Sequence, residues 1–162
     1  MKNKISAIFL SLSLFFVFAV NAFAAINSVS DIEAKKTKIS TIVSSDYSKF
    51  YNKTEIIGNR LNMFQMNTEK YKSEVQQVES RLNRIIEQIN FIQSADIPGK
   101  EVEIKKLYQD AEDALQDIDS KTLQYLSTVR TGLPTLTYNK FVKNFINFYN
   151  GVNISNKTLR YN

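Results

Sequence analysis

Residues 57–92, IGNRLNMFQMNTEKYKSEVQQVESRLNRIIEQINFI, decide the fold. Apolar residues recur here in alternating steps of four and three, and only Thr68 interrupts them. The apolar positions are Ile57, Leu61, Phe64, Tyr71, Val75, Val78, Leu82, Ile85, Ile89 and Ile92. A repeat of about 3.5 residues predicts a helix with one narrow apolar stripe, like the seam of a coiled coil. A helix over residues 54–94 would be on the order of 60 Å long, so we expect an elongated molecule.

Two turn sequences divide the rest of the chain after this helix. Pro98 and Gly99 end it, and apolar residues at heptad spacing predict another helix over residues 98–130. Two long helices joined by a short turn form an antiparallel hairpin. After Pro134, a dense run of apolar and aromatic residues predicts a short amphipathic helix over residues 136–150.

The stretch before the hairpin carries a weaker apolar stripe, which predicts a helix over residues 30–51. Ser30 and Glu33 form a capping box at its start. Asn52 begins a second such box, so we expect a break or kink there, and the alternative is one helix that runs on into the seam. The polar residues 153–162 predict a loose tail. The fold class is therefore all-α, an elongated hairpin or bundle of about four helices.

The first residues form a separate segment. Lys2 and Lys4 precede an apolar run over residues 5–20, and Ala22 and Ala24 place small side chains where a signal peptidase cleaves. We expect a cleaved signal peptide over residues 1–24, and the alternative is an uncleaved membrane anchor. The remaining residues 25–162 then form one exported domain, secreted or periplasmic. The absence of Cys in an exported chain is typical of a bacterial periplasmic protein.

Catalysis and metal binding have few candidate residues. The chain has no His and no Cys, so the commonest general base, the thiol nucleophile and the usual zinc ligands are missing. The acidic run from Asp110 to Asp119 is the best candidate for a hard cation, but a rigid helix seldom wraps six oxygens around an ion. We therefore expect no enzyme, no cofactor, no metal site and no nucleic-acid partner.

Charge is distributed unevenly along the chain, because every Asp and Glu lies at or before Asp119. The basic end that follows coincides with the aromatic helix over residues 136–150. Two interpretations stay open. The aromatic residues close the end of the bundle, or the helix lies on an anionic membrane or in the acidic groove of a partner.

These patterns predict binding through helical surfaces. The leading hypothesis is an exported interaction protein with a protein partner, such as an assembly factor, adaptor or adhesin of the cell envelope or a secretion system. The alternatives are a membrane-active or toxin-associated protein acting through its last helix, and a carrier that holds an apolar ligand between helices. The apolar seam also allows a homo-oligomer. The candidate interaction surface consists of Tyr47, Phe50, Tyr51, Tyr138, Lys140, Phe141, Lys143, Phe145, Phe148 and Tyr149.

Overall fold

The computed structural model describes residues 25–56, 58–155 and 157–160. Every regular element in these ranges is helical, which confirms the all-α prediction. The elements are α2 (Val29–Ser44), the 3₁₀ helices η1 (Tyr47–Phe50) and η2 (Lys53–Glu55), α3 (Asn59–Ser94), α4 (Lys100–Val129) and α5 (Thr135–Val152). The expected signal peptide and Ile57 lie outside the described residues.

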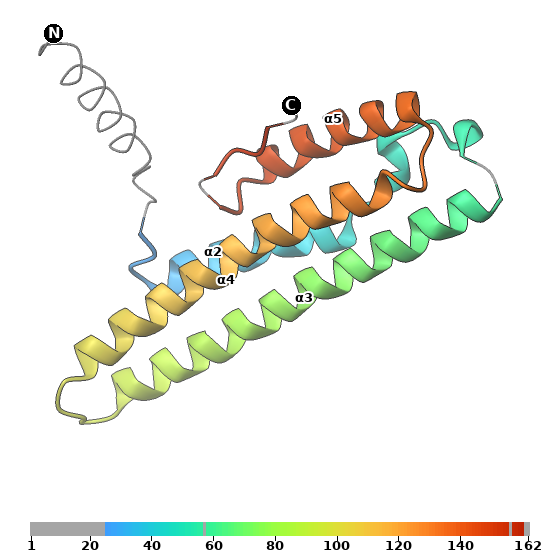
Figure 1. The fold of residues 1–162 in the computed structure, drawn as a ribbon. Helices are drawn as coiled ribbons and strands as arrows, with labels where there is room; N and C mark the ends of the chain where they lie inside the picture. The colour runs from blue at the N-terminus through green and yellow to red at the C-terminus, as the bar shows by residue number, and fades with distance from the viewer. Residues whose placement is uncertain (1–24, 57, 156, 161–162) are drawn as a thin grey trace, which may run out of the picture.

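The antiparallel hairpin of α3 and α4 is the longest part of the molecule (Figure 1). With 36 residues, α3 is about 54 Å long. Its predicted stripe is buried from Phe64 to Ile89, and Leu61 and Ile92 are half-buried at its two ends. Thr68 occupies its place in the stripe, donates a hydrogen bond to the Phe64 carbonyl (2.8 Å) and contacts the Tyr125 hydroxyl (2.8 Å). The one polar residue of the seam is therefore satisfied.

The first helix, α2, packs against α3 and ends at Ser44. The prediction that it continues to residue 51 is wrong. The backbone becomes extended at the C-cap Ser45 (φ −65°, ψ 140°), and the hydroxyls of Ser44 and Ser45 donate to backbone carbonyls four residues earlier. Asp46 then accepts a hydrogen bond from the Ser48 amide (2.9 Å) and caps the separate turn η1.

The two predicted caps of this region have different outcomes. Ser28, and not the predicted Ser30, caps α2, because its hydroxyl accepts from the Asp31 amide. The predicted break near Asn52 is confirmed, since two 3₁₀ turns separate α2 from α3. Asn52 accepts a hydrogen bond from the Thr54 amide (3.2 Å), but this cap serves η2 alone.

The described part of the C-terminal tail packs on the bundle, so the prediction of a loose tail is wrong there. Ile154 and Leu159 are buried. The side chain of Asn150 bonds both backbone polar groups of Leu159, each at 3.0 Å. The Ser155 hydroxyl donates to the buried carboxylate of Asp119. The tail folds back along α5 and adds to the core.

Candidate interaction surfaces

Half of the residues predicted to form the interaction surface lie in the core. These are Tyr47, Phe50, Phe141, Phe145 and Tyr149, all at most 6% exposed. The turn η1 inserts Tyr47 and Phe50 toward α5, where their rings lie 5.1 and 5.6 Å from the ring of Phe145. Edge-to-face contacts at these separations are favourable. The aromatic face of α5 is thus turned into the bundle, and these five side chains are core residues instead of a surface.

The other predicted residues lie at the margin of this aromatic core. Tyr51, Tyr138 and Phe148 are half-buried, while Lys140 and Lys143 are exposed. The Tyr51 ring meets the Phe64 ring at 4.8 Å, and Lys49 lies over the Phe148 ring at 4.8 Å. Of the ten predicted residues, only the two lysines have side chains that are largely exposed to solvent.

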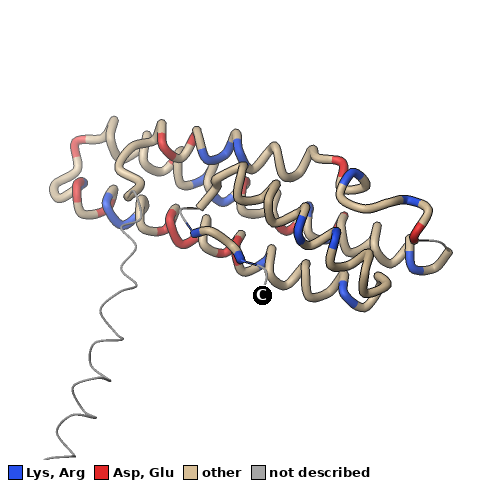
Figure 2. Tube along the Cα trace, turned by 90° about the horizontal axis from the view of Figure 1, so that it is seen from above, with Lys and Arg blue, Asp and Glu red and all other residues tan. Residues whose placement is uncertain are grey.

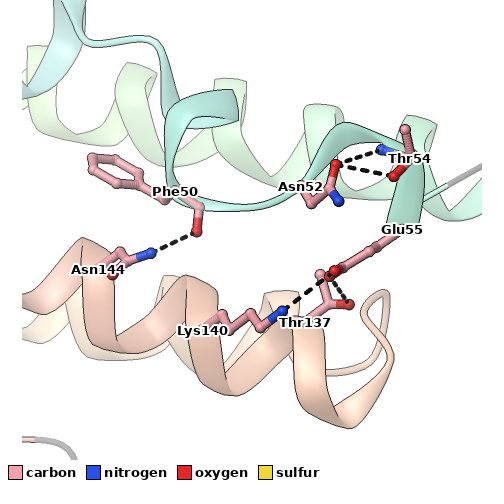
Figure 3. Close-up of polar contacts among 7 residues, drawn as sticks. All are labelled: Phe50, Asn52, Thr54, Glu55, Thr137, Lys140 and Asn144. Carbon is pink, nitrogen blue, oxygen red and sulfur yellow. Dashed lines mark hydrogen bonds and ion pairs between the residues drawn. The ribbon is translucent and has the colours of Figure 1, made fainter.

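A polar contact ties the segment between α2 and α3 to α5 (Figure 3). Glu55 accepts hydrogen bonds from the Thr137 hydroxyl (2.9 Å) and from Lys140 (3.4 Å). The hydrogen bond from Thr137 lowers the pKa of Glu55, and the charge of Lys140 acts in the same direction. One helical turn further on, Asn144 donates to the Phe50 carbonyl (3.1 Å). These contacts hold η1 and η2 against α5.

Polar groups inside the bundle are paired with one another. The Tyr71 hydroxyl contacts Thr122 at 2.6 Å, and the Tyr71 and Tyr125 rings stack at 4.6 Å. Burial raises the pKa of both tyrosines. The carboxylate of Asp119, 3% exposed, accepts from the Tyr149 hydroxyl at 2.6 Å. Every buried side-chain nitrogen and oxygen among the described residues has a partner, so this network stabilises the core.

Large apolar side chains are exposed at the free end of the hairpin. Phe91 is 70% exposed, Val102 76% and Ile97 43%. The contacts of Thr68 with Tyr125 and of Tyr71 with Thr122 fix the register of α3 and α4, and this register puts Phe91 and Val102 at the same level. The sequence analysis did not identify Phe91 and Val102 as candidates. The available signal was that both are apolar residues outside the heptad positions of their helices.

This end of the hairpin projects beyond the other helices. Figure 1 shows that the turn between α3 and α4 extends past the start of α2 and lies far from α5. The contact of the segment before α2 agrees with this arrangement. The amide of Ile26 donates a hydrogen bond to the carboxylate of Glu112 (2.8 Å), and Glu112 lies twelve residues beyond the start of α4. Both signs of charge occur along the hairpin (Figure 2). The other exposed large apolar side chains of the hairpin, Met63, Met66 and Leu123, lie in the first part of α3 and the last part of α4, away from this end.

A groove lies between α4 and α5 at the opposite end of the hairpin. Its volume is about 490 Å³. It is lined by Leu123, Leu126, Ser127, Arg130, Leu133, Thr135, Tyr138, Asn139, Val142, Ile146 and Arg160. Both of its charged residues are arginines. Arg130 lies over the Tyr138 ring at 5.9 Å.

Two other kinds of feature are absent from residues 25–56, 58–155 and 157–160. No group of three or more carboxylates is placed to hold a metal ion in these ranges. In the acidic run of α4, Asp117 pairs with Lys121 and Asp113 accepts from Gln109. No described helix has the length and apolarity needed to span a bilayer.

Comparison of the chain with protein-family models, with curated proteins and with solved structures gave no match. The candidate sites of this chain are the apolar end of the hairpin and the groove between α4 and α5.

Proposed function

We propose that this chain is an exported helical interaction protein. It serves as an assembly factor, adaptor or adhesin of the cell envelope or a secretion system. It binds a protein partner through the free end of the α3–α4 hairpin. One observation carries this proposal. Phe91, Ile97 and Val102 expose their apolar side chains at an end that projects past α2 and α5. We refer to these three residues as the hairpin-end patch.

The hairpin is a suitable support for such a patch. Its two helices share a buried seam that reaches from Phe64 to Ile89 on α3, and half-buried Ile92 and Ile104 extend this packing toward the turn. A partner that covers Phe91 gains roughly 2–3 kcal/mol from burial of its ring. Aromatic side chains at the centre of an interface commonly dominate its binding energy. The chemistry of the patch fits apolar side chains of a partner protein.

Photo-cross-linking tests the patch directly. A photoreactive residue is placed at Phe91 or Val102 in the producing cells, with matched controls at exposed Gln88 and Lys105 on the same helices. We expect adducts with a different protein at positions 91 and 102 and none at the controls. The partner is then identified by mass spectrometry, and F91S should weaken its binding by about 10- to 100-fold.

Three outcomes would refute this function. They are adducts of equal yield at the control positions, absence of any adduct at 91 and 102, and adducts that contain only a second copy of this chain. The last result would make the patch a site of self-association.

Export is supported by the sequence of residues 1–24 and has its own test. Mass spectrometry of the protein recovered from the envelope or medium should give Ala25 as its first residue. Recovery of the intact chain from the membrane fraction would favour the uncleaved anchor.

Action on a membrane through α5 has less support. An amphipathic helix binds a membrane through its apolar face, and in α5 the residues Phe141, Phe145 and Tyr149 of that face are buried in the bundle. Membrane binding would require α5 to detach from η1 and lose these contacts. We also propose that the protein is not an enzyme, because the buried polar groups described above form hydrogen bonds with one another.

A further inference from the structure

The groove between α4 and α5 receives positive charge from two separate segments of the chain. Arg130 is the C-cap of α4, and Arg160 follows Leu159 in the docked tail. The side chain of Asn150 bonds both backbone polar groups of Leu159, each at 3.0 Å, and so fixes this part of the tail beside α5. Both arginines are exposed and line the groove. The docking of the tail therefore brings a second guanidinium group to the end of α4.

Neither arginine is neutralised by an acidic residue in the described ranges. The ion pairs there are Lys70–Glu74, Lys121–Asp117 and Lys140–Glu55. No Asp or Glu occurs after Asp119 in the sequence, and the lining of the groove contains none. Arg130 lies instead over the Tyr138 ring, where it keeps its charge. The groove is therefore complementary to an anion.

The side chains that a ligand in the groove can reach are mainly polar. The apolar residues Leu126, Leu133, Val142 and Ile146 line it, but each is at most 7% exposed. The exposed residues of the lining are Leu123, Ser127, Arg130, Thr135, Asn139 and Arg160. Ser127 and Thr135 add hydroxyl groups beside the two guanidinium groups. A ligand that matches this lining carries hydroxyl groups as well as negative charge.

Size and charge together favour a small phosphorylated molecule. Binding pockets for small molecules occupy about 300–1,000 Å³, and the groove measures about 490 Å³. One guanidinium satisfies a carboxylate through two parallel hydrogen bonds. A phosphate monoester carries a charge of about −1.5 to −2 at pH 7 and three acceptor oxygens, so it can use both arginines. Tyr138 is the one aromatic residue in the described lining, and Arg130 already lies over its ring. This arrangement favours a sugar over a nucleobase.

We propose that this groove binds a sugar phosphate. The phosphate pairs with the guanidinium groups of Arg130 and Arg160, and hydroxyl groups of the sugar bond to Ser127 and Thr135. Arginine is suited to this role because its planar guanidinium donates two parallel hydrogen bonds to phosphate oxygens. A free sugar phosphate and the phosphorylated sugar headgroup of a lipid share this chemistry. The site lies at the other end of the hairpin from the hairpin-end patch, so it is independent of the proposed function.

NMR titration of the ¹⁵N-labelled protein with glucose 6-phosphate tests the site. We expect saturable shifts of the amide signals around the groove, with one molecule bound per chain. R130Q and R160Q should each weaken this binding about tenfold, because each removes a charge-assisted contact to the phosphate. L123E adds a carboxylate to an exposed position of the lining and should weaken it further. K143Q removes a positive charge from an exposed residue of α5 outside the groove and should leave the affinity unchanged.

Two further ligands separate the contributions of phosphate and sugar on the unmodified protein. Glucose should bind at least about tenfold more weakly than glucose 6-phosphate, because it lacks the charged group. Inorganic phosphate should also bind more weakly, because it lacks the sugar hydroxyls. The proposal is overturned by equal affinities of R130Q and K143Q, by an affinity for glucose or for inorganic phosphate that equals that for glucose 6-phosphate, or by the absence of saturable shifts.

Vesicle flotation separates the two sources of the ligand. Phosphatidylcholine vesicles that contain phosphatidylinositol 4-phosphate present a phosphorylated sugar on a lipid. If R130Q abolishes flotation with these vesicles, the result supports the proposal with a lipid headgroup as the source. Binding of glucose 6-phosphate without flotation supports it with a free sugar phosphate. Equal flotation with phosphatidylserine vesicles, in the absence of binding to glucose 6-phosphate, would overturn it in favour of a general anionic membrane surface.

Discussion

The buried carboxylate of Asp119 allows a direct test of how the C-terminal tail is held. Two hydroxyls donate to it, that of Tyr149 on α5 (2.6 Å) and that of Ser155 in the tail (2.8 and 2.9 Å to its two oxygens). The substitutions Tyr149→Phe and Ser155→Ala each remove one donor. Both leave the surrounding apolar packing nearly unchanged, so the measured loss reports the hydrogen bonds.

The expected magnitude follows from the burial of Asp119, which is 3% exposed. A hydrogen bond to a charged group is worth about 1.5–3 kcal/mol, and a carboxylate without access to water cannot replace the lost donor. We therefore expect each variant to lower the free energy of unfolding by about 2 kcal/mol, equivalent to roughly 4–8 °C in Tm. The double variant should lose more than the sum, because it leaves Asp119 buried without either donor.

Urea denaturation followed by circular dichroism measures these losses. Thr158→Ala, which removes an exposed hydroxyl from the same tail, serves as the control and should change the free energy of unfolding by less than about 0.5 kcal/mol. If S155A and Y149F unfold at the same urea concentration as this control, Asp119 is not enclosed by α5 and the tail. The packed arrangement of the C-terminal residues would then be refuted.

Three further predictions concern the seam and the titrating groups. Leu82→Ala, at a fully buried seam position, should cost about 2–5 kcal/mol in urea unfolding, and a loss near zero would contradict a packed hairpin. Because Thr137 lowers the pKa of Glu55, Glu55 contributes stability above its ordinary pKa of about 4.3 that is lost as the pH falls through the lowered value. T137V should raise that pKa in an NMR titration, and no change would refute the contact. Burial raises the pKa of Tyr47, Tyr71, Tyr125 and Tyr149, so their stabilising effect is complete below pH ~10 and is lost as the pH rises further. Ultraviolet absorbance of their phenolates should appear only together with loss of helical circular dichroism.

The hairpin could be predicted from the sequence because its signal is periodic. The steps of four and three from Leu61 to Ile92 place one stripe on a helix without reference to any other part of the chain. The turn at Pro98 and Gly99 then determines the antiparallel arrangement. The predicted end of the long helix at residue 94 is confirmed, but its predicted start at residue 54 is wrong, because α3 begins at Asn59 after Gly58, whose φ is +60°.

The end of α2 and the docking of the tail could not be read in the same way. The helix α2 ends at Ser44, although an apolar stripe continues through Phe50. The tail looks polar, but Ser155 reaches Asp119 from 36 residues away in the sequence. Contacts between residues that are far apart in the sequence follow no repeat, so no local pattern predicts them.

Five of the ten residues predicted for the interaction surface are buried for a related reason. Clusters of aromatic residues are expected both in a core and in an interface, and only the position of η1 shows that Tyr47 and Phe50 meet the aromatic face of α5. Phe91 and Val102 became candidates because the structure shows that neither is covered. Exposure depends on the arrangement of all the helices, which the sequence of a single helix does not contain.

Hydroxyl-radical footprinting of the purified protein, read by mass spectrometry for each aromatic residue, tests the central claim most directly. The claim is that the aromatic face of α5 lies inside the bundle while the hairpin end is exposed to solvent. We expect Phe91, 70% exposed, to be modified rapidly, and Phe141 and Phe145, both at 0%, to be protected. Rapid modification of Phe141 and Phe145 together with protection of Phe91 would contradict the account.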